Sequence, residues 1–239
     1  GVVWPSRGVR HPGHLVLFVA DQPMSKAQQA LWALRNCPEV DLFEAQKLFT
    51  DQRGHWIEVT LAYASVVVGA SPRMGKTFIV RAMRLVAGRD VRARVAALDG
   101  KGTGDFAPMR PFLDFYSVGD EPEELERVLF YLRGLRIEMR RRAKVIRGLP
   151  FEQCPDSKTT SDLASDRKLG LELIVVGIDE TQVYFEDAPT DLRKEFASIV
   201  VDLVKRGPAL GIILILAPQT GTKDPIPPGS GPETSSRPS

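Results

Sequence analysis

The chain has 239 residues, of which 43% are hydrophobic and 26% are charged, as in an ordinary globular protein. The formal net charge of +2 is too small to indicate nucleic-acid binding by itself. The two cysteines lie far apart and exclude a disulfide framework, and the three histidines lack the neighbours that a metal cluster requires. The sequence has no apolar run long enough for a membrane helix, so we expect a cytoplasmic protein.

Residues 1–62 are predicted to form a small α/β lead-in region. His14 to Ala20 reads as a strand, and Trp56 to Leu61 alternates between apolar and polar residues as a half-buried strand does. Between them, Ser25 to Gln28 forms a capping box that predicts the start of an amphipathic helix ending near Asn36.

A phosphate-binding loop is predicted at Ser65 to Thr77, SVVVGASPRMGKT. A short apolar strand leads into a turn-rich segment and then into Gly75-Lys76-Thr77, which opens a sequence with helical spacing. Such a loop turns backbone N–H groups toward phosphate oxygens, and the next helix adds its positive N-terminus. The first glycine of the usual pattern is Ala70 here, which restricts positive φ. The alternative is a strand–turn–helix with an exposed lysine and a threonine cap.

The next predicted strand, Arg94 to Asp99, is followed by a glycine-rich segment that ends at Asp105. One interpretation of this segment is a flexible loop. The other is an active-site loop that uses Asp99 or Lys101, because ligands bind beyond the carboxyl ends of parallel strands.

A long helix is predicted from Glu121 to Arg147, with acidic residues at its start and basic residues at its end. This gradient complements the helix macrodipole. The basic end is either a solvated helix terminus or a contact surface for DNA phosphates. Its positive side chains are Arg136, Arg140, Arg141, Arg142, Lys144 and Arg147.

Two acids end the apolar run Leu173 to Ile178, which has the composition of a fully buried parallel strand. Asp179 is placed to hold Mg²⁺ and Glu180 to orient or deprotonate the attacking water. The alternative is a surface acidic pair that closes a strand. A helix over Asp191 to Lys205 and a strand over Leu210 to Ala217 complete an alternating pattern that predicts a doubly wound parallel sheet.

Five segments occur here in one order: GASPRMGKT, ALDGKGTGD, EMRRRAKVIRGLP, VVGIDETQ and VKRGPALGIILILA. Together they resemble the FtsK/SpoIIIE DNA translocases, and most closely the actinobacterial TraB-like proteins of conjugative elements. The resemblance covers about Phe43 to Gln219. It implies a RecA-like P-loop NTPase domain over residues 63–219, with a mainly parallel sheet and helices on both faces.

The resemblance also implies a function. A domain of this kind hydrolyses ATP with Mg²⁺ as a ring-shaped homo-hexamer and moves double-stranded DNA in conjugation or chromosome partitioning. The full-length parent is expected to be membrane-anchored, with this domain on the cytoplasmic face.

Site residues follow from the motifs. Lys76 and Glu180 are the expected catalytic residues, and Thr77 and Asp179 the expected Mg²⁺ ligands. The resemblance adds Gln219 as a polar sensor after the last strand and Arg206 as the arginine that serves a neighbouring subunit; the alternative for Arg206 is a helix-terminal side chain that meets its own dipole. The expected nucleotide-binding residues are Ala70, Ser71, Pro72, Arg73, Met74, Gly75, Lys76, Thr77, Phe78 and Gln219.

The chain departs from the family after its last predicted strand. Family members usually read Ala-Thr-Gln-Arg-Pro there, whereas this chain reads Ala217-Pro218-Gln219-Thr220 and then becomes rich in Pro, Gly and Ser. We therefore expect a disordered tail over residues 220–239 and a motor fold that is incomplete on its C-terminal side, as in a truncated or frame-shifted copy. Two other functions stay open: a nucleotide-binding module without turnover, and a related ring ATPase that drives protein export.

Overall fold

The structure, a computed structural model, describes residues 2–7, 15–20, 39–51, 54–69 and 75–218. The predicted helix between Ser25 and Asn36 and the predicted tail lie outside these residues. The described residues fall into two compact units, one within 1–38 and 46–59 and the other within 39–45 and 60–239. The elements are β1 (Val2–Arg7), β2 (Leu15–Ala20), β3 (Gln46–Thr50), β4 (Trp56–Val59), β5 (Val66–Val67), α1 (Lys76–Ala87), β6 (Ala93–Asp99), η3 (Ala107–Phe112), β7 (Phe115–Val118), α2 (Pro122–Gly148), α3 (Ser161–Ser165), β8 (Leu173–Asp179), η4 (Val183–Asp187), α4 (Thr190–Arg206), η5 (Pro208–Leu210) and β9 (Ile212–Ala217).

The smaller unit contains two antiparallel strand pairs. β1 pairs with β2, and β3 pairs with β4 with an irregularity between Lys47 and Phe49. The predicted strands near 14–20 and 56–61 are confirmed as β2 and β4. β1 and β3 were not predicted; β1 contains Pro5, which lacks an N–H donor and weakens a strand signal.

The larger unit is built on a five-stranded sheet in the order β5-β9-β8-β6-β7, and every pairing in it is parallel. β9 therefore lies between β5, which precedes the predicted phosphate-binding loop, and β8, which ends in Asp179. β8 and β9 are buried along their whole length, which explains why their sequences are continuous apolar runs. β7 was not predicted, because four residues carry too weak a pattern.

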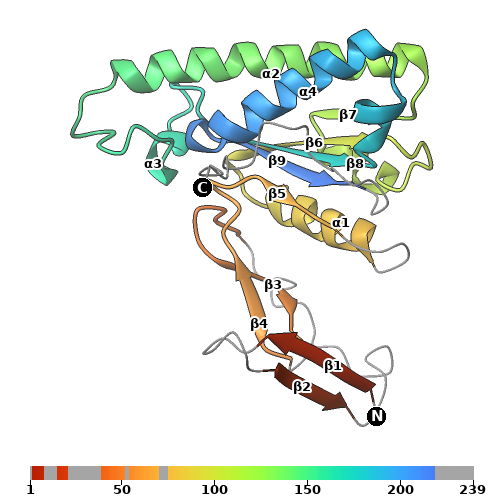
Figure 1. Cartoon of the computed structure of the whole chain (residues 1–239). Coiled ribbons are helices and arrows are strands. Elements are labelled where there is room, and N and C mark those ends of the chain that lie inside the picture. Colours follow the sequence, from red (N-terminus) through yellow and green to blue (C-terminus); the bar gives the residue numbers. More distant parts are fainter. Residues whose placement is uncertain (1, 8–14, 21–38, 52–53, 70–74, 219–239) are drawn as a thin grey trace, which may run out of the picture. The chain divides into compact units, whose positions relative to one another are not determined.

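Helices cover both faces of this sheet (Figure 1), as predicted. α2 and α4 pack together over one face, where they share a core with alternate residues of β6, β8 and β9 such as Leu98, Val176 and Leu214. α1 packs on the opposite face against β6, β8 and β9. The residues between those alternate positions, including Asp99, Gly177 and Asp179, point to the α1 side because strand side chains alternate.

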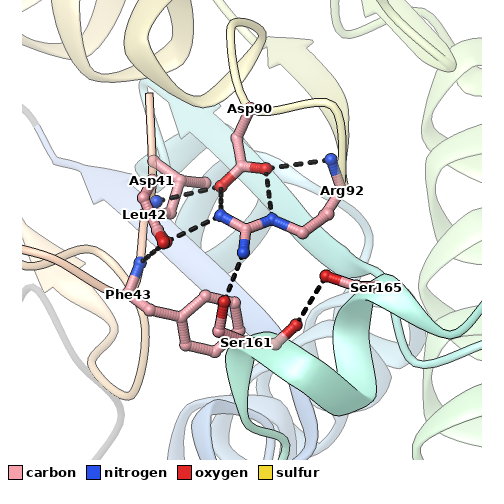
Figure 2. Close-up of polar contacts among 7 residues, drawn as sticks. All are labelled: Asp41, Leu42, Phe43, Asp90, Arg92, Ser161 and Ser165. Atoms are coloured by element: carbon pink, nitrogen blue, oxygen red, sulfur yellow. Dashed lines mark hydrogen bonds and ion pairs between the residues drawn. The ribbon is translucent and has the colours of Figure 1, made fainter. Parts of the chain in front are cut away.

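Within the larger unit, an ion-pair cluster connects the segment 39–45 with Asp90 and Arg92 (Figure 2). The Arg92 guanidinium lies 2.7 Å from the Asp41 carboxylate and 2.9 Å from that of Asp90, and it donates to the Ser161 hydroxyl on α3. Asp90 also accepts from the Leu42 backbone N–H at 2.9 Å. Residues 39–45 and 60–62 thus belong to the same compact unit as the five-stranded sheet.

The predicted long helix is confirmed as α2, which runs for 27 residues. Near its end, Glu138 pairs with Arg141 and Arg142, and Arg142 is fully buried. Arg140, Lys144 and Arg147 are exposed at i, i+4, i+7 spacing, so they share one helix face. Among the described residues no helix combines the length and the apolar character that crossing a membrane requires.

Candidate nucleotide site

Lys76 meets the two acids predicted to share its site. Its Nζ atom lies 3.4 Å from Asp179 Oδ1 and 3.2 Å from Glu180 Oε1, and it donates to the Ala217 carbonyl at 3.3 Å. The first residue of α1 and the carboxyl ends of β8 and β9 therefore converge on one point. The Lys76 side chain is only 11% exposed, so the alternative of an exposed lysine does not hold.

Gly75 shows why a glycine precedes this lysine. Its φ of 86° lies in the left-handed region that other residues rarely adopt, and it forms the N-cap of α1. Thr77 follows in the first turn and is partly buried, while Phe78 is 71% exposed. The predicted loop residues Ala70, Ser71, Pro72, Arg73 and Met74 lie outside the described residues, as does Gln219.

Asp179 and Glu180 differ in their surroundings. Asp179 is 1% exposed at the end of β8, and its Oδ1 atom accepts from the Glu180 backbone N–H at 3.1 Å. Glu180 has a φ of 51°, an uncommon conformation for a residue with a side chain. Its carboxylate contacts Lys76 and also accepts from the Gln182 amide. The pair is therefore held within the site and is not a surface acidic pair.

The loop after β6 packs against this pair. Gly100 donates to the Asp179 carbonyl at 3.3 Å, and a Cβ atom at Gly100 would stand 3.1 Å from the Glu180 carbonyl. Asp99 is fully buried beside Asp179 in the sheet register, and its Oδ2 atom accepts from the Asp105 N–H. Burial and then the charge of Asp179 raise the pKa of Asp99. This proximity favours the active-site interpretation of the loop for Asp99, whereas Lys101 is half exposed and pairs with Asp105.

Solved structures with the same fold place this site in context. The chain matches the pCW3 conjugation coupling protein TcpA with ATPγS at TM-score 0.56 and 17% identity, over 74% of this chain and 50% of that one. EssC ATPases 2 and 3 from Geobacillus thermodenitrificans match at 0.57 and 19%, over 80% and 36%. The type VII secretion ATPase EccC of Thermomonospora curvata matches at 0.56 and 19%, over 77% and 22%.

The chain has the fold of an FtsK/SpoIIIE-type ATPase. No protein-family profile matches its sequence, and no curated protein matches it either. The chain spans half or less of the length of these three neighbours. The parallel sheet explains the convergence at Lys76, since the start of α1 and the carboxyl ends of β8 and β9 meet at one sheet edge.

The remaining predicted FtsK-type residue, Arg206, lies at the end of α4. Its guanidinium pairs with Asp202 one turn earlier on the same helix, and this hydrogen bond raises the pKa of Arg206. The side chain is exposed. It therefore takes no part in the convergence at Lys76, and its expected role toward a neighbouring subunit stays a prediction.

Two residues near the candidate nucleotide site were not predicted. Gln182 donates to Glu180, and Arg84, on α1, is fully buried against Gly177 of β8. Two features of the sequence pointed to Arg84. It lies four residues after Val80 and eight after Lys76, so all three share one helix face. Gly177 interrupts an otherwise apolar strand. A glycine inside a strand often marks the close approach of another group.

The described residues fit a magnesium nucleotide. The ammonium of Lys76, the partly buried hydroxyl of Thr77 and the buried carboxylate of Asp179 are the donor types that triphosphates and Mg²⁺ require. Asp99 adds a second buried carboxylate whose Oδ1 atom has no hydrogen-bond partner within the described part of the chain.

Proposed function

We propose that this chain binds Mg-ATP at Lys76 and Asp179 and is the ATP-hydrolysing motor domain of a DNA translocase. The observation that carries the proposal is the position of the Lys76 ammonium within 3.4 Å of both carboxylates at the end of β8. A strand-end acid pair beside a loop lysine at a helix N-terminus is suited to phosphoryl transfer.

Each residue has a distinct task in this proposal. Lys76 would exchange its carboxylate contacts for the β- and γ-phosphates. Thr77 and Asp179 would hold Mg²⁺, which would neutralise phosphate charge. Glu180 then accepts a proton from the attacking water. Gln182 fixes the Glu180 carboxylate by donating to its other oxygen. Arg206 is proposed to act on a neighbouring subunit's nucleotide, and a homo-hexamer would bring these groups together.

Double-stranded DNA is the proposed substrate, for two reasons. The neighbour solved with ATPγS is described as a conjugation coupling protein. In addition, Arg140, Lys144 and Arg147 form an exposed basic face with no ion pair among the described residues. A solvated helix end remains the alternative for that face.

Protein export is the second candidate function. EccC, which matches with a similar TM-score, is described as a type VII secretion ATPase. Both candidate functions use the same nucleotide site, so the transported substrate is what distinguishes them.

Phosphate release from ATP, measured with and without duplex DNA at several salt concentrations, tests the proposal. Turnover that DNA stimulates in a salt-dependent manner supports the translocase. Turnover without DNA binding at any salt concentration favours the export ATPase. Tight Mg-ATP binding without turnover in any assembled form indicates a nucleotide-binding module, and an absence of nucleotide binding overturns the proposal.

A further inference from the structure

Arg84 is a fully buried cation next to the candidate nucleotide site. It lies on α1 eight residues after Lys76, on the helix face that packs against the sheet. None of its three guanidinium nitrogens has a hydrogen-bond partner within the described part of the chain. An isolated buried charge is costly, so it persists in a fold only where other groups compensate it.

The sheet is shaped to receive this guanidinium. A Cβ atom at Gly177 would stand 1.9 Å from Arg84 Nε, so only glycine leaves room there. Ala97, the neighbour of Gly177 in the register, is also small. The guanidinium carbon lies 3.9 Å from the centroid of the buried Phe106 ring, which provides a cation–π contact.

Two carboxylates lie one step further along the same strands. Asp99 and Asp179 pair with each other in the sheet register, two residues after Ala97 and Gly177. Because strand side chains alternate between the two faces, these positions all lie on the α1 side. Both are buried, so their like charges repel with little screening by water. Burial lowers the pKa of Arg84 to about 10, and the charges of Asp179 and Asp99 oppose that shift, so the guanidinium stays positive at neutral pH.

We propose that Arg84 is a positioning residue that holds Asp99 and Asp179 as a pair of neighbouring carboxylates for the magnesium nucleotide. The inference rests on the proposed function. In that function Lys76 gives up its contacts with Asp179 and Glu180 to meet the phosphates. Arg84 is packed between α1 and the sheet and keeps its place, so it is the cation that continues to balance the carboxylate pair.

The test measures the affinity of the full chain for a fluorescent N-methylanthraniloyl-ADP, with Mg²⁺ and with EDTA. Arg84→Met removes the charge but keeps the volume, and it should lower the affinity in Mg²⁺ about tenfold or more, the size typical of lost outer-shell partners of a metal site. The affinity in EDTA should change little. Arg84→Lys restores a charge and should recover most of the Mg²⁺-dependent affinity.

A role in packing alone predicts the opposite order, because Met fills an apolar space better than Lys. Arg142→Met is the matched control: Arg142 is also fully buried, but it pairs with Glu138 on α2, so this variant should lose stability without changing the ratio of the two affinities. Gly177→Ala keeps the Arg84 charge but displaces it, and it should behave like Arg84→Met.

A charge-balance variant covers the case in which Arg84→Met folds poorly. Arg84→Met combined with Asp99→Asn removes one charge of each sign, so the double variant should melt at a higher temperature than Arg84→Met alone. The inference is overturned if the double variant is no more stable than Arg84→Met. It is also overturned if Arg84→Met and Arg84→Lys have equal affinities in Mg²⁺. Neither result affects the proposed function. If the unaltered chain binds no nucleotide, the proposed function fails and the inference fails with it.

Discussion

Two carboxylates and one backbone carbonyl contact the ammonium of Lys76, whose side chain is only 11% exposed. No neutral side chain can replace this charge against triphosphate oxygens. Lys76→Ala should therefore abolish Mg-ATP binding or weaken it at least a hundredfold in calorimetry. Lys194→Ala, which removes an exposed lysine on α4, serves as the control and should bind normally. Unchanged affinity in Lys76→Ala would refute the phosphate-binding assignment.

In the proposed function, Glu180 serves hydrolysis and is not needed for nucleotide binding. Glu180→Gln keeps the shape and the contact with Gln182, but an amide does not accept a proton at neutral pH. We expect nucleotide affinity to be retained and phosphate release, in whichever assembled form turns over, to fall roughly 10²–10⁴-fold, the usual contribution of a general base. Glu186→Gln changes an exposed acid six residues further on and is the matched control. Equal turnover of the two variants would remove Glu180 from the mechanism.

Which site residues the sequence reveals depends on whether a motif fixes them. Lys76 and Asp179 were predicted to meet because their motifs mark a helix start and a strand end at the same sheet edge. Arg84 escaped prediction because a charged residue within an apolar stripe is normally taken to face solvent. Its burial depends on the missing side chain at Gly177, which belongs to a strand almost a hundred residues later.

At the scale of elements, long segments with strong patterns were predicted and short ones were not. α2, α4, β8 and β9 were found close to their true ends because each has a sustained period or a continuous apolar run. β7 and α3 have four and five residues, and tertiary contacts decide their conformation. The same holds for the segment 39–45, whose place beside the sheet depends on Asp90 and Arg92, about fifty residues away.

The Arg92 cluster should contribute strongly to stability. Asp90 is fully buried, and Arg92 joins it to Asp41 and to α3. Removing one partner of a buried pair costs roughly 3–5 kcal/mol, so Arg92→Ala should lower the free energy of unfolding in urea by about 3 kcal/mol. Arg94→Ala breaks a comparable but exposed pair with Asp114 and should cost less than about 1 kcal/mol. Similar losses in both variants would show that the cluster has no special role.

The cluster also gives stability a pH dependence. Burial acts to raise the pKa of Asp90, but the hydrogen bonds from the Arg92 side chain and the Leu42 and Arg92 amides lower it below its ordinary value. A lowered pKa means that the contribution is complete near neutral pH and is lost as the pH falls through that pKa. Lowering the pH below about 4 should therefore reduce the free energy of unfolding of the unaltered chain more than that of the Arg92→Ala variant.

At the scale of the whole molecule, the parallel sheet brings Lys76, Asp179 and Glu180 together at one edge. β9 separates the loop strand from the acid-bearing strand, so Lys76 reaches Asp179 across the end of β9 and contacts the Ala217 carbonyl on the way. A nucleotide at this edge would touch α1, β8 and the loop after β6 together. Nucleotide binding would thus be coupled to the packing of elements that are distant in the sequence.

The basic face of α2 provides the test of the proposed DNA substrate. Replacing Arg140, Lys144 and Arg147 by glutamine removes three exposed charges from one helix face. Each phosphate contact contributes about 0.9 to the slope of log Kobs against log salt concentration, so the slope should become less steep by roughly 2.7 if all three residues contact duplex DNA. The measurement is fluorescence anisotropy of a labelled duplex between low and moderate salt.

The control variant combines Arg167→Gln with Lys168→Gln. It removes two exposed charges from the loop before β8 and should leave the slope unchanged. An unchanged slope in the α2 variant would identify the face as a solvated helix end, where the three cations only complement the dipole of their own helix.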